Sequence, residues 1–243
     1  MQHRYFIHLS FDGTAYHGWQ VQPQSVSVQS VVEHALATIL RHTVNITGAG
    51  RTDAGVHARH MVAHFDAEVL DCQQLTYKLN RLLPHDIAIE RIERVGADMH
   101  ARYSAKRRTY HYYIHTQKDV FRRAHSCEIH YPLDFDAMNT AARWLLQVED
   151  FAAFCKSNSD VKTTLCQVMQ AEWSCQGQGR WCFTITANRF LRNMVRAIVG
   201  TLIDVGRGRL DLQGFKNVVG SHARTQAGES MPAKALFLWK VEY

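Results

Sequence analysis

The sequence has little of what would make a chain disordered, membrane-bound or disulfide-linked. Only four of its 243 residues are proline, while 46% are apolar, a composition typical of a globular protein with a sizeable core. No apolar run approaches the roughly 20 residues that a helix needs to span a bilayer. The N-terminal segment lacks the apolar core of a signal peptide, and none of the six cysteines forms a CxxC pair. We therefore expect a cytoplasmic protein with reduced, mostly buried thiols.

Common nucleotide and metal motifs are also missing. No lysine follows the glycines of residues 48–55 as a P-loop requires. The third glycine of a G-x-G-x-x-G dinucleotide motif is replaced by Asp53, whose charge would repel a pyrophosphate. There is no HExxH zinc motif. These absences exclude the usual phosphate cradles.

The charge balance is basic. Lys and Arg number 28 against 22 Asp and Glu, a formal net charge of +6, and 15 histidines can add partial charge below neutral pH. Such a surface favours a polyanionic partner, because each neutralised phosphate releases counterions. It could equally serve solubility, and charge alone does not decide between the two.

Hydrophobic periodicity predicts strand–helix–strand units in both halves of the chain. Ser27 or Ser30 is expected to cap the first helix and Asp71 the second. A polar, basic run near residues 100–106 predicts a boundary between subdomains 1–104 and 105–243. The expected class is α+β, with two α/β subdomains forming one continuous, mostly antiparallel sheet flanked by helices around a basic cleft. Strands are expected at 5–11, 61–67, 86–92, 107–116, 165–175, 180–187 and 234–243, and helices at 27–40, 71–84, 134–147 and 190–206.

Spacing also predicts which side chains face a core. Alternation over 107–116 points every second side chain to one face, and helix periodicity gives apolar stripes in the second and last helices. The inward-facing residues expected are Tyr110, Tyr112 and Ile114 of that strand; Leu75, Leu79, Leu82 and Leu83 of the second helix; and Val195, Ile198, Val199, Leu202 and Val205 of the last.

The stretch GAGRTDAGVHA, residues 48–58, places Asp53 among glycines and close to Arg51. Gly48, Gly50 and Gly55 are expected to allow backbone conformations or close approaches closed to residues with a Cβ. A nearby arginine favours the ionised carboxylate, which suits nucleophilic attack or proton abstraction. Asp53 could instead cap a turn. The loop alone leaves both interpretations open.

A metal site is a further alternative. His57, His60 and His64 lie close together in the sequence, with aspartates on either side. They could bind a divalent metal and support a nuclease. Neighbouring histidines in a basic protein are more often surface or RNA-contacting residues, so we favour an active site without metal.

Several segments in order resemble one family. GAGRTDAGVHA is similar to the active-site loop of pseudouridine synthases, in the form typical of the bacterial tRNA pseudouridine synthase A family. The resemblance extends over FDGTAYHGWQVQPQSVSVQSVVEHAL, LPHDIAI, DMHARYSAKRRTYHYYI, FLRNMVRAIVGTLIDVGRG and PAKALFLWKVEY. It covers essentially the whole chain, with little family signal around 117–185. Met231 and Lys234 depart from the small or acidic residues expected there.

The resemblance implies an isomerase that converts uridine to pseudouridine at positions 38, 39 and 40 of the tRNA anticodon arm. It implies Asp53 as catalytic nucleophile, Arg51 as a residue that displaces the base, Tyr110 as a stacking partner of the uracil, and Arg196 as the ion-pair partner of Asp53. It also implies a pseudouridine synthase fold and a homodimer, with no metal and no organic cofactor.

A rival interpretation is a tRNA-binding chaperone that has no catalytic activity. The presence of all four site residues, Asp53, Arg51, Tyr110 and Arg196, argues against it.

Basic residues outside the active site suggest how RNA is held. Phosphate contacts orient RNA without reading its bases. The basic residues expected to hold the RNA are Arg102, Lys106, Arg107 and Arg108, beside the tyrosine strand, and Arg207 and Arg209, after the last helix.

Overall fold

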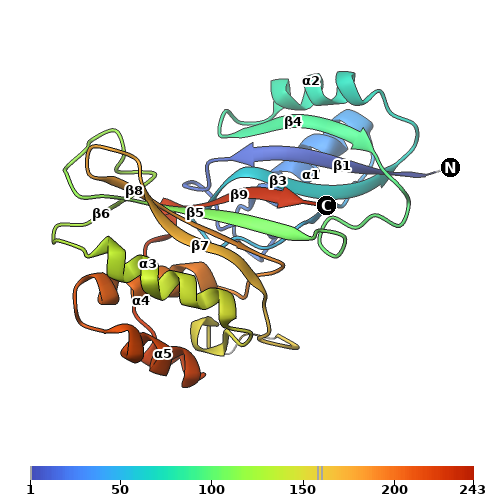
Figure 1. Ribbon diagram of the computed structural model, residues 1–243. Coiled ribbons are helices and arrows are strands. Elements are labelled where there is room, and N and C mark those ends of the chain that lie inside the picture. Colours follow the sequence, from blue (N-terminus) through green and yellow to red (C-terminus); the bar gives the residue numbers. More distant parts are fainter. Residues whose placement is uncertain (1, 158, 160) are drawn as a thin grey trace. The chain divides into compact units, whose positions relative to one another are not determined.

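The structure is a computed structural model that describes residues 2–157, 159 and 161–243. Its packing divides the chain into two compact units, shown in Figure 1. Unit 1 is Met1–Lys106 together with Phe237–Tyr243, and unit 2 is Arg107–Leu236. The division expected from the sequence cuts after residue 104 and leaves the last strand with the second subdomain. In the structure the last seven residues belong with unit 1.

The sheet of unit 1 has the strand order β4-β1-β3-β9, with β2 beside β3. β1 runs antiparallel to both β3 and β4, whereas β3 and β9 are parallel. Tyr5 faces Phe65 across β1 and β3, and their rings stack with centroids 5.6 Å apart. The strands are β1 (His3–Phe11), β2 (Thr47–Gly48), β3 (His57–Ala67), β4 (Ile87–Arg94) and β9 (Leu236–Glu242).

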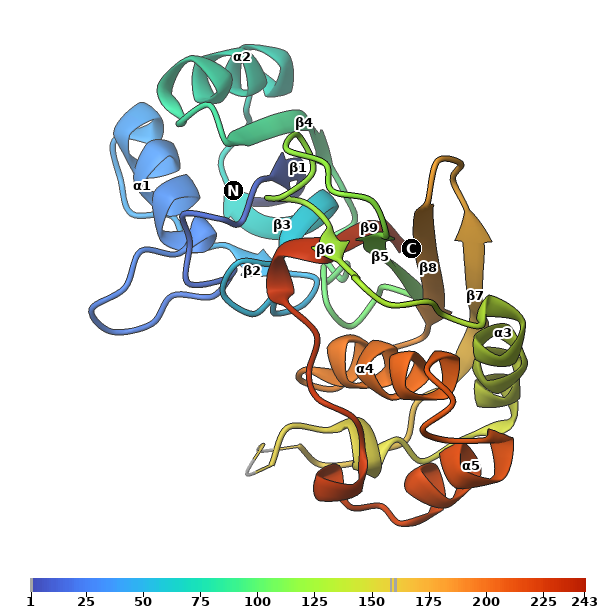
Figure 2. The same ribbon diagram turned by 90° about the vertical axis from the view of Figure 1, so that its left-hand side faces the viewer.

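Two helices, α1 (Val28–Leu40) and α2 (Cys72–Leu82), lie on one side of this sheet (Figure 2). Ser27 caps α1: its side chain accepts a hydrogen bond from the backbone N–H of Ser30. The side chain of Ser30 accepts one from the backbone N–H of Ser27, which completes a capping box. Asp71 caps α2 as expected.

The expectation for Leu82 is wrong. Leu75 and Leu79 are buried as expected, but Leu82 is 48% exposed. Leu83, the C-cap of α2, has extended backbone angles and is only 8% exposed. Because the chain leaves the helix there, the last two leucines cannot share one helical stripe.

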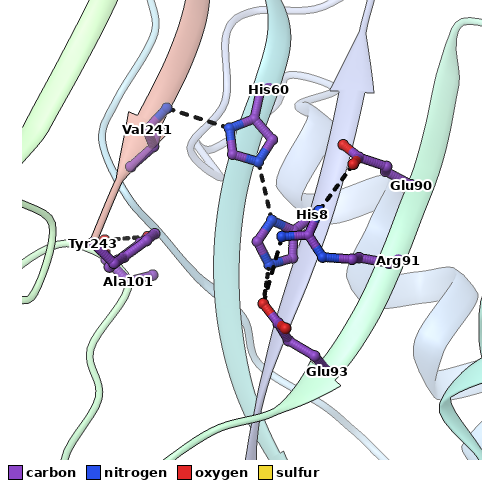
Figure 3. Close-up of polar contacts among 8 residues, drawn as sticks. All are labelled: His8, His60, Glu90, Arg91, Glu93, Ala101, Val241 and Tyr243. Carbon is purple, nitrogen blue, oxygen red and sulfur yellow. Dashed lines mark hydrogen bonds and ion pairs between the residues drawn. The ribbon is translucent and has the colours of Figure 1, made fainter.

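A chain of hydrogen bonds ties β9 into unit 1 (Figure 3). The backbone N–H of Val241 donates to Nδ1 of His60 on β3 at 3.3 Å. His60 Nε2 lies 3.0 Å from Nδ1 of His8 on β1, and His8 Nε2 lies 2.8 Å from Oε1 of Glu93 on β4. The chain thus crosses four strands of the sheet.

The sheet of unit 2 has β8 between β5 and β7, both antiparallel to it, and β6 parallel to β5. The expected hairpin around residues 176–179 is present, with Gly177 and Gly179 in the left-handed region. The alternation expected in β5 is also confirmed, since Tyr110, Tyr112 and Ile114 are all buried. The strands are β5 (Arg107–His115), β6 (Cys127–Glu128), β7 (Val168–Cys175) and β8 (Arg180–Ala187).

Three helices complete unit 2: α3 (Phe135–Trp144), α4 (Met194–Gly206) and α5 (Leu212–Gly220). The expected stripe of α4 is buried, but the helix begins four residues later than expected, because Asn193 has a left-handed backbone with φ of 67°. α5 is not among the elements expected from the sequence. Its signals are an Asp211 cap and buried residues at helical spacing. Short 3-10 turns occupy Leu145–Gln147, Ala152–Phe154, Arg224–Gln226 and Ala233–Ala235.

The α+β class expected from the sequence is confirmed, with mostly antiparallel pairing and helices against the sheets. Within the described residues, no helix combines the length and apolar character needed to cross a membrane.

Candidate active site

The loop that carries Asp53 joins β2 to β3. Its first part is fixed to β3 by a hydrogen bond from Ala49 N–H to Val62 O at 2.8 Å. Its last part is a turn in which Val56 N–H donates to Asp53 O at 3.1 Å, with Gly55 at a φ of 77°. The turn ends directly before His57, the first residue of β3, so Asp53 is held close to the start of a central strand.

A second segment, residues 13–19, supports the loop. Gly55 N–H donates to Tyr16 O at 3.3 Å, and Trp19 N–H donates to Thr52 O at 3.4 Å. A Cβ on Gly18 would lie 2.2 Å from Thr52 O, and Gly18 itself has a φ of 87°. Only glycine therefore fits at position 18 without displacing the residue that precedes Asp53.

Two further glycines meet the same steric limit. A Cβ on Gly13 would lie 2.0 Å from Val56 O, and one on Gly48 would lie 2.3 Å from Nε1 of Trp19. Gly50 differs from the expectation, because a Cβ there would have no heavy atom of the described residues within 4 Å and its φ is not positive. Its backbone faces open space, where a ligand can approach it closely.

Asp53 is half-buried and Arg51 is exposed. Both lie on the loop of unit 1, two positions apart in the chain. The part played by segment 13–19 was missed by sequence reasoning. The available signal was the pair Gly13 and Gly18 on either side of an aromatic turn.

Tyr110 lies on β5 in unit 2, opposite Ile185 of β8. It is 9% exposed, and its ring meets Phe190 edge-to-face with centroids 5.0 Å apart. This contact fixes the orientation of the ring. Tyr112, two residues on, is fully buried and donates to Pro232 O at 3.0 Å.

Arg196 lies in the first turn of α4 in unit 2 and is half-buried. Its Nε donates to Met231 O at 2.6 Å, and Met231 N–H donates to Arg196 O at 3.2 Å. The segment before Met231 approaches α4 closely, because a Cβ on Gly200 would lie 1.8 Å from Glu229 O. Arg196 is thus held from both its backbone and its side chain.

The structure gives each histidine of the alternative metal site a backbone partner. His57 Nδ1 accepts from Gly13 N–H at 3.0 Å, and His64 Nδ1 accepts from Ala101 N–H at 3.2 Å. His60 accepts from Val241 as described above. Each of these rings joins β3 to a different segment of unit 1.

The basic residues expected to hold RNA differ in their surroundings. Arg207 lies over the ring of Tyr131, 4.1 Å from its centroid, and Arg209 lies 3.3 Å from Asp204. Arg108 donates to Asn188 O at 2.8 Å, and Arg107 is exposed.

Fold and loop together define an α+β protein that presents a carboxylate on a braced, glycine-rich loop. A family model described as tRNA pseudouridine synthase matches residues 8–104 and 141–243. Relatives named tRNA pseudouridine synthase A come from several bacteria. One from Bacteroides fragilis is 54% identical over 242 residues, which is 99% of this chain and 96% of the relative.

More distant relatives agree. A protein of that name from Porphyromonas gingivalis is 50% identical over 99% of this chain and 97% of the relative. Another, from Bacillus licheniformis, is 38% identical over 97% of each. The chain therefore belongs to the tRNA pseudouridine synthase family, a family of isomerases.

The matched ranges include Arg51, Asp53 and Arg196. Tyr110 falls in residues 105–140, between the two matched ranges. Its proposed part therefore depends on the local motif resemblance and on its place in β5.

Proposed function

We propose that this protein isomerises uridine to pseudouridine at positions 38, 39 and 40 of the tRNA anticodon arm. Family membership supports the reaction, and the names of the relatives support tRNA as the substrate. The observation that carries the proposal is the position of Asp53, which is half-buried on its loop. Segment 13–19 packs closely against this loop because Gly18 has no Cβ.

The reaction sets what the site must do. The N1–C1′ bond breaks, the uracil turns, and a C5–C1′ bond forms, while C5 loses the proton that N1 gains. The exchange is redox-neutral and consumes no water. It needs a carboxylate that attacks the ribose or the ring, or that removes a sugar proton. Asp53 would supply this group.

The target nucleoside must leave its stack, which costs a few kcal/mol. Arg51, exposed on the same loop as Asp53, would displace the base and take its place in the RNA. Stacking on an aromatic face recovers about 1–3 kcal/mol per base. Tyr110, oriented by Phe190, would provide this face for the uracil.

Arg196 would pair with Asp53 and keep it ionised when RNA displaces water. The bond from its Nε to Met231 O fixes the position of the guanidinium.

The protein would act as a homodimer in the cytoplasm, without metal or organic cofactor. The basic balance of the chain, +6, supports a polyanionic partner. We propose that the exposed basic residues around β5 hold the phosphates of the anticodon arm.

Mass spectrometry tests the proposal, using unmodified tRNA incubated with the protein and then derivatised specifically at pseudouridine. We expect the label at positions 38–40 with the wild-type protein and none with Asp53→Asn, which hardly changes side-chain volume. Asp71→Asn is the matched control, because asparagine also caps helices and α2 should persist.

Three results would contradict the proposal. If the tRNA binds the protein but carries no pseudouridine after incubation, the chaperone would be favoured. Turnover retained within a few-fold by Asp53→Asn would remove that residue from the chemistry. Activity abolished by chelator, with stoichiometric metal bound, would favour the nuclease.

A further inference from the structure

The segment between β5 and β6 displays an unusual aromatic side chain. Phe121 is 91% exposed and its neighbour Val120 is 62% exposed. Figure 1 shows the segment as a loop beyond the end of β5, near the β7–β8 turn. Thr116, at its start, donates through its N–H to Gly179 O of that turn at 3.0 Å. The ring is therefore presented to solvent by unit 2.

Internal bonds give this loop a defined shape. Asp119 Oδ1 accepts from Phe121 N–H at 2.9 Å, and Asp119 Oδ2 lies 3.1 Å from Nε of Arg122. Lys234 Nζ donates to Arg123 O at 2.7 Å. Beyond the loop, Ser126 bonds to the ring of a buried histidine of β5. A ligand that bound Phe121 would have little chain left to order, which lowers the cost of binding.

The charge around the ring favours a polyanion. Lys118, Arg122 and Arg123 lie within three residues of Phe121, against the single carboxylate of Asp119. Phe121 and Arg122 line an open surface hollow together with Asp119, His125 and Ser126. An aromatic face with adjacent basic groups is the combination that binds single-stranded nucleic acid.

The same patch is a poor fit for a protein partner. Specific protein interfaces bury at least about 1,000 Å². Two apolar side chains among three cations offer too little apolar area for such an interface. One base, by contrast, is matched in size by one phenyl ring.

We infer that Phe121 is a stacking platform for an unpaired base of the tRNA anticodon arm, with Arg123 contacting its phosphate. This inference rests on the proposed function. It adds an RNA subsite whose role is binding and not chemistry. The ring holds one face of the base, and the basic side chains fix the backbone beside it.

Fluorescence anisotropy of a labelled anticodon arm measures the effect on binding, with Asp53→Asn as the background so that no turnover occurs. Phe121→Leu keeps an apolar side chain but removes the aromatic face, and we expect Kd to rise at least about 5-fold. Phe121→Trp keeps the aromatic face and should bind within about 2-fold of the parent. Equal binding by Phe121→Leu and the parent, or equal weakening by both variants, would overturn the inference.

Two controls separate the alternatives. Tyr77→Leu removes an aromatic side chain that is 66% exposed on α2 and should leave Kd unchanged. Arg123→Gln should lower the slope of log Kd against log salt by about one, and an unchanged slope would overturn the phosphate contact. An altered sedimentation coefficient of Phe121→Leu alone, with Kd unchanged, would overturn RNA in favour of a second copy of the chain.

The failure of this inference differs from the failure of the proposed function. Wild-type protein that forms pseudouridine while Phe121→Leu binds normally would overturn the subsite alone. Wild-type protein that binds tRNA without forming pseudouridine would overturn the function, whatever Phe121 does. In the wild-type background, we expect Phe121→Leu to raise KM and to change kcat by less than about 2-fold. A lowered kcat with KM unchanged would overturn the binding role.

Discussion

His8 and His60 are joined by a hydrogen bond of 3.0 Å between Nδ1 of His8 and Nε2 of His60 (Figure 3). The other partners of the two rings, Val241 and Glu93, fix which ring donates. Because His60 Nδ1 accepts from Val241 N–H, the proton of neutral His60 is on Nε2 and is donated to His8. The proton of neutral His8 is then on its own Nε2 and is donated to Glu93. Both rings must be neutral for the chain to be complete.

This relationship predicts that low pH loosens β9. Burial lowers the pKa of His8 and the charge of Arg91 lowers it further, while Glu93 and Glu90 raise it by smaller amounts. Burial also lowers the pKa of His60, and His8 lowers it further, with smaller effects from Glu90, which raises it, and from Arg91 and Lys240, which lower it. A depressed folded-state pKa contributes stability that is present above the ordinary value near 6.5 and is lost as pH falls below it. A protonated Nδ1 of His60 cannot accept from Val241.

Amide hydrogen exchange measures this effect. We expect the protection factor of Val241, corrected for intrinsic exchange, to fall between pH 7 and pH 5, while that of Leu36 in α1 changes little. In His8→Asn the step should move, because the partner of His60 is changed. A protection factor for Val241 that is flat with pH would contradict the proton directions given above.

Burial lowers the pKa of His64 to about 4, with a further lowering from His100. Its Nδ1 accepts from Ala101 N–H. The free energy of unfolding should therefore decrease from pH 6.5 toward pH 4, by about 1.4 kcal/mol per pH unit for this one group. Urea unfolding at several pH values measures it. The slope should be smaller in His64→Asn and unchanged in His42→Asn, at an exposed position.

Gly18→Ala should strongly reduce kcat. The added Cβ would lie 2.2 Å from Thr52 O, and the φ of 87° disfavours any side chain. The displaced loop would move Asp53, and misplacement by about 1 Å can cost about 100-fold in rate. Single-turnover kinetics and thermal unfolding of the same samples separate misplacement from loss of fold. Gly220→Ala, where a Cβ meets no heavy atom of the described residues within 4 Å, is the matched control. A wild-type kcat in Gly18→Ala would show that segment 13–19 does not position Asp53.

The proposed pairing of Arg196 with Asp53 predicts that Arg196→Met lowers kcat by at least about 100-fold. Without the guanidinium, the Asp53 carboxylate would lose the charge that favours its ionised form when RNA displaces water. Arg196→Lys keeps the charge but loses the bond from Nε to Met231 O, so its kcat should lie between those of Arg196→Met and the wild type. Steady-state kinetics on tRNA provides the comparison, with circular dichroism to check α4. Unchanged kinetics in Arg196→Met would show that Arg196 has no role in the reaction.

The affinity for tRNA should fall steeply with salt. Each phosphate contact contributes about 0.7–0.9 to the slope of log Kd against log salt. A cluster of four basic residues beside Tyr110 predicts a slope of roughly 3 or more. Filter binding from 50 to 300 mM salt measures it, and a flat profile would count against basic residues that follow the backbone of the RNA.

Features that depend on neighbouring residues could be predicted from the amino-acid sequence. The sequence predicted that Ser27 or Ser30 caps α1, and the cap is Ser27, whose side chain reaches the backbone of Ser30, three residues away. Tyr110 and Tyr112 share one face because side chains alternate along any strand. Asp53 could be singled out because Gly48, Gly50 and Gly55 all lie within five residues of it in the chain. These relationships are local, so the sequence was enough to predict them.

Contacts between segments far apart in the sequence became visible only in the folded protein. His60 and Val241 are 181 residues apart, and nothing in either segment predicts that an imidazole accepts the N–H of the last strand. The same holds for Gly18 against Thr52, and for Gly200 against Glu229. In both pairs the requirement for glycine comes from a second backbone, brought close by packing. Such distances are set by the fold as a whole, because loop closure and core packing together choose which segments meet.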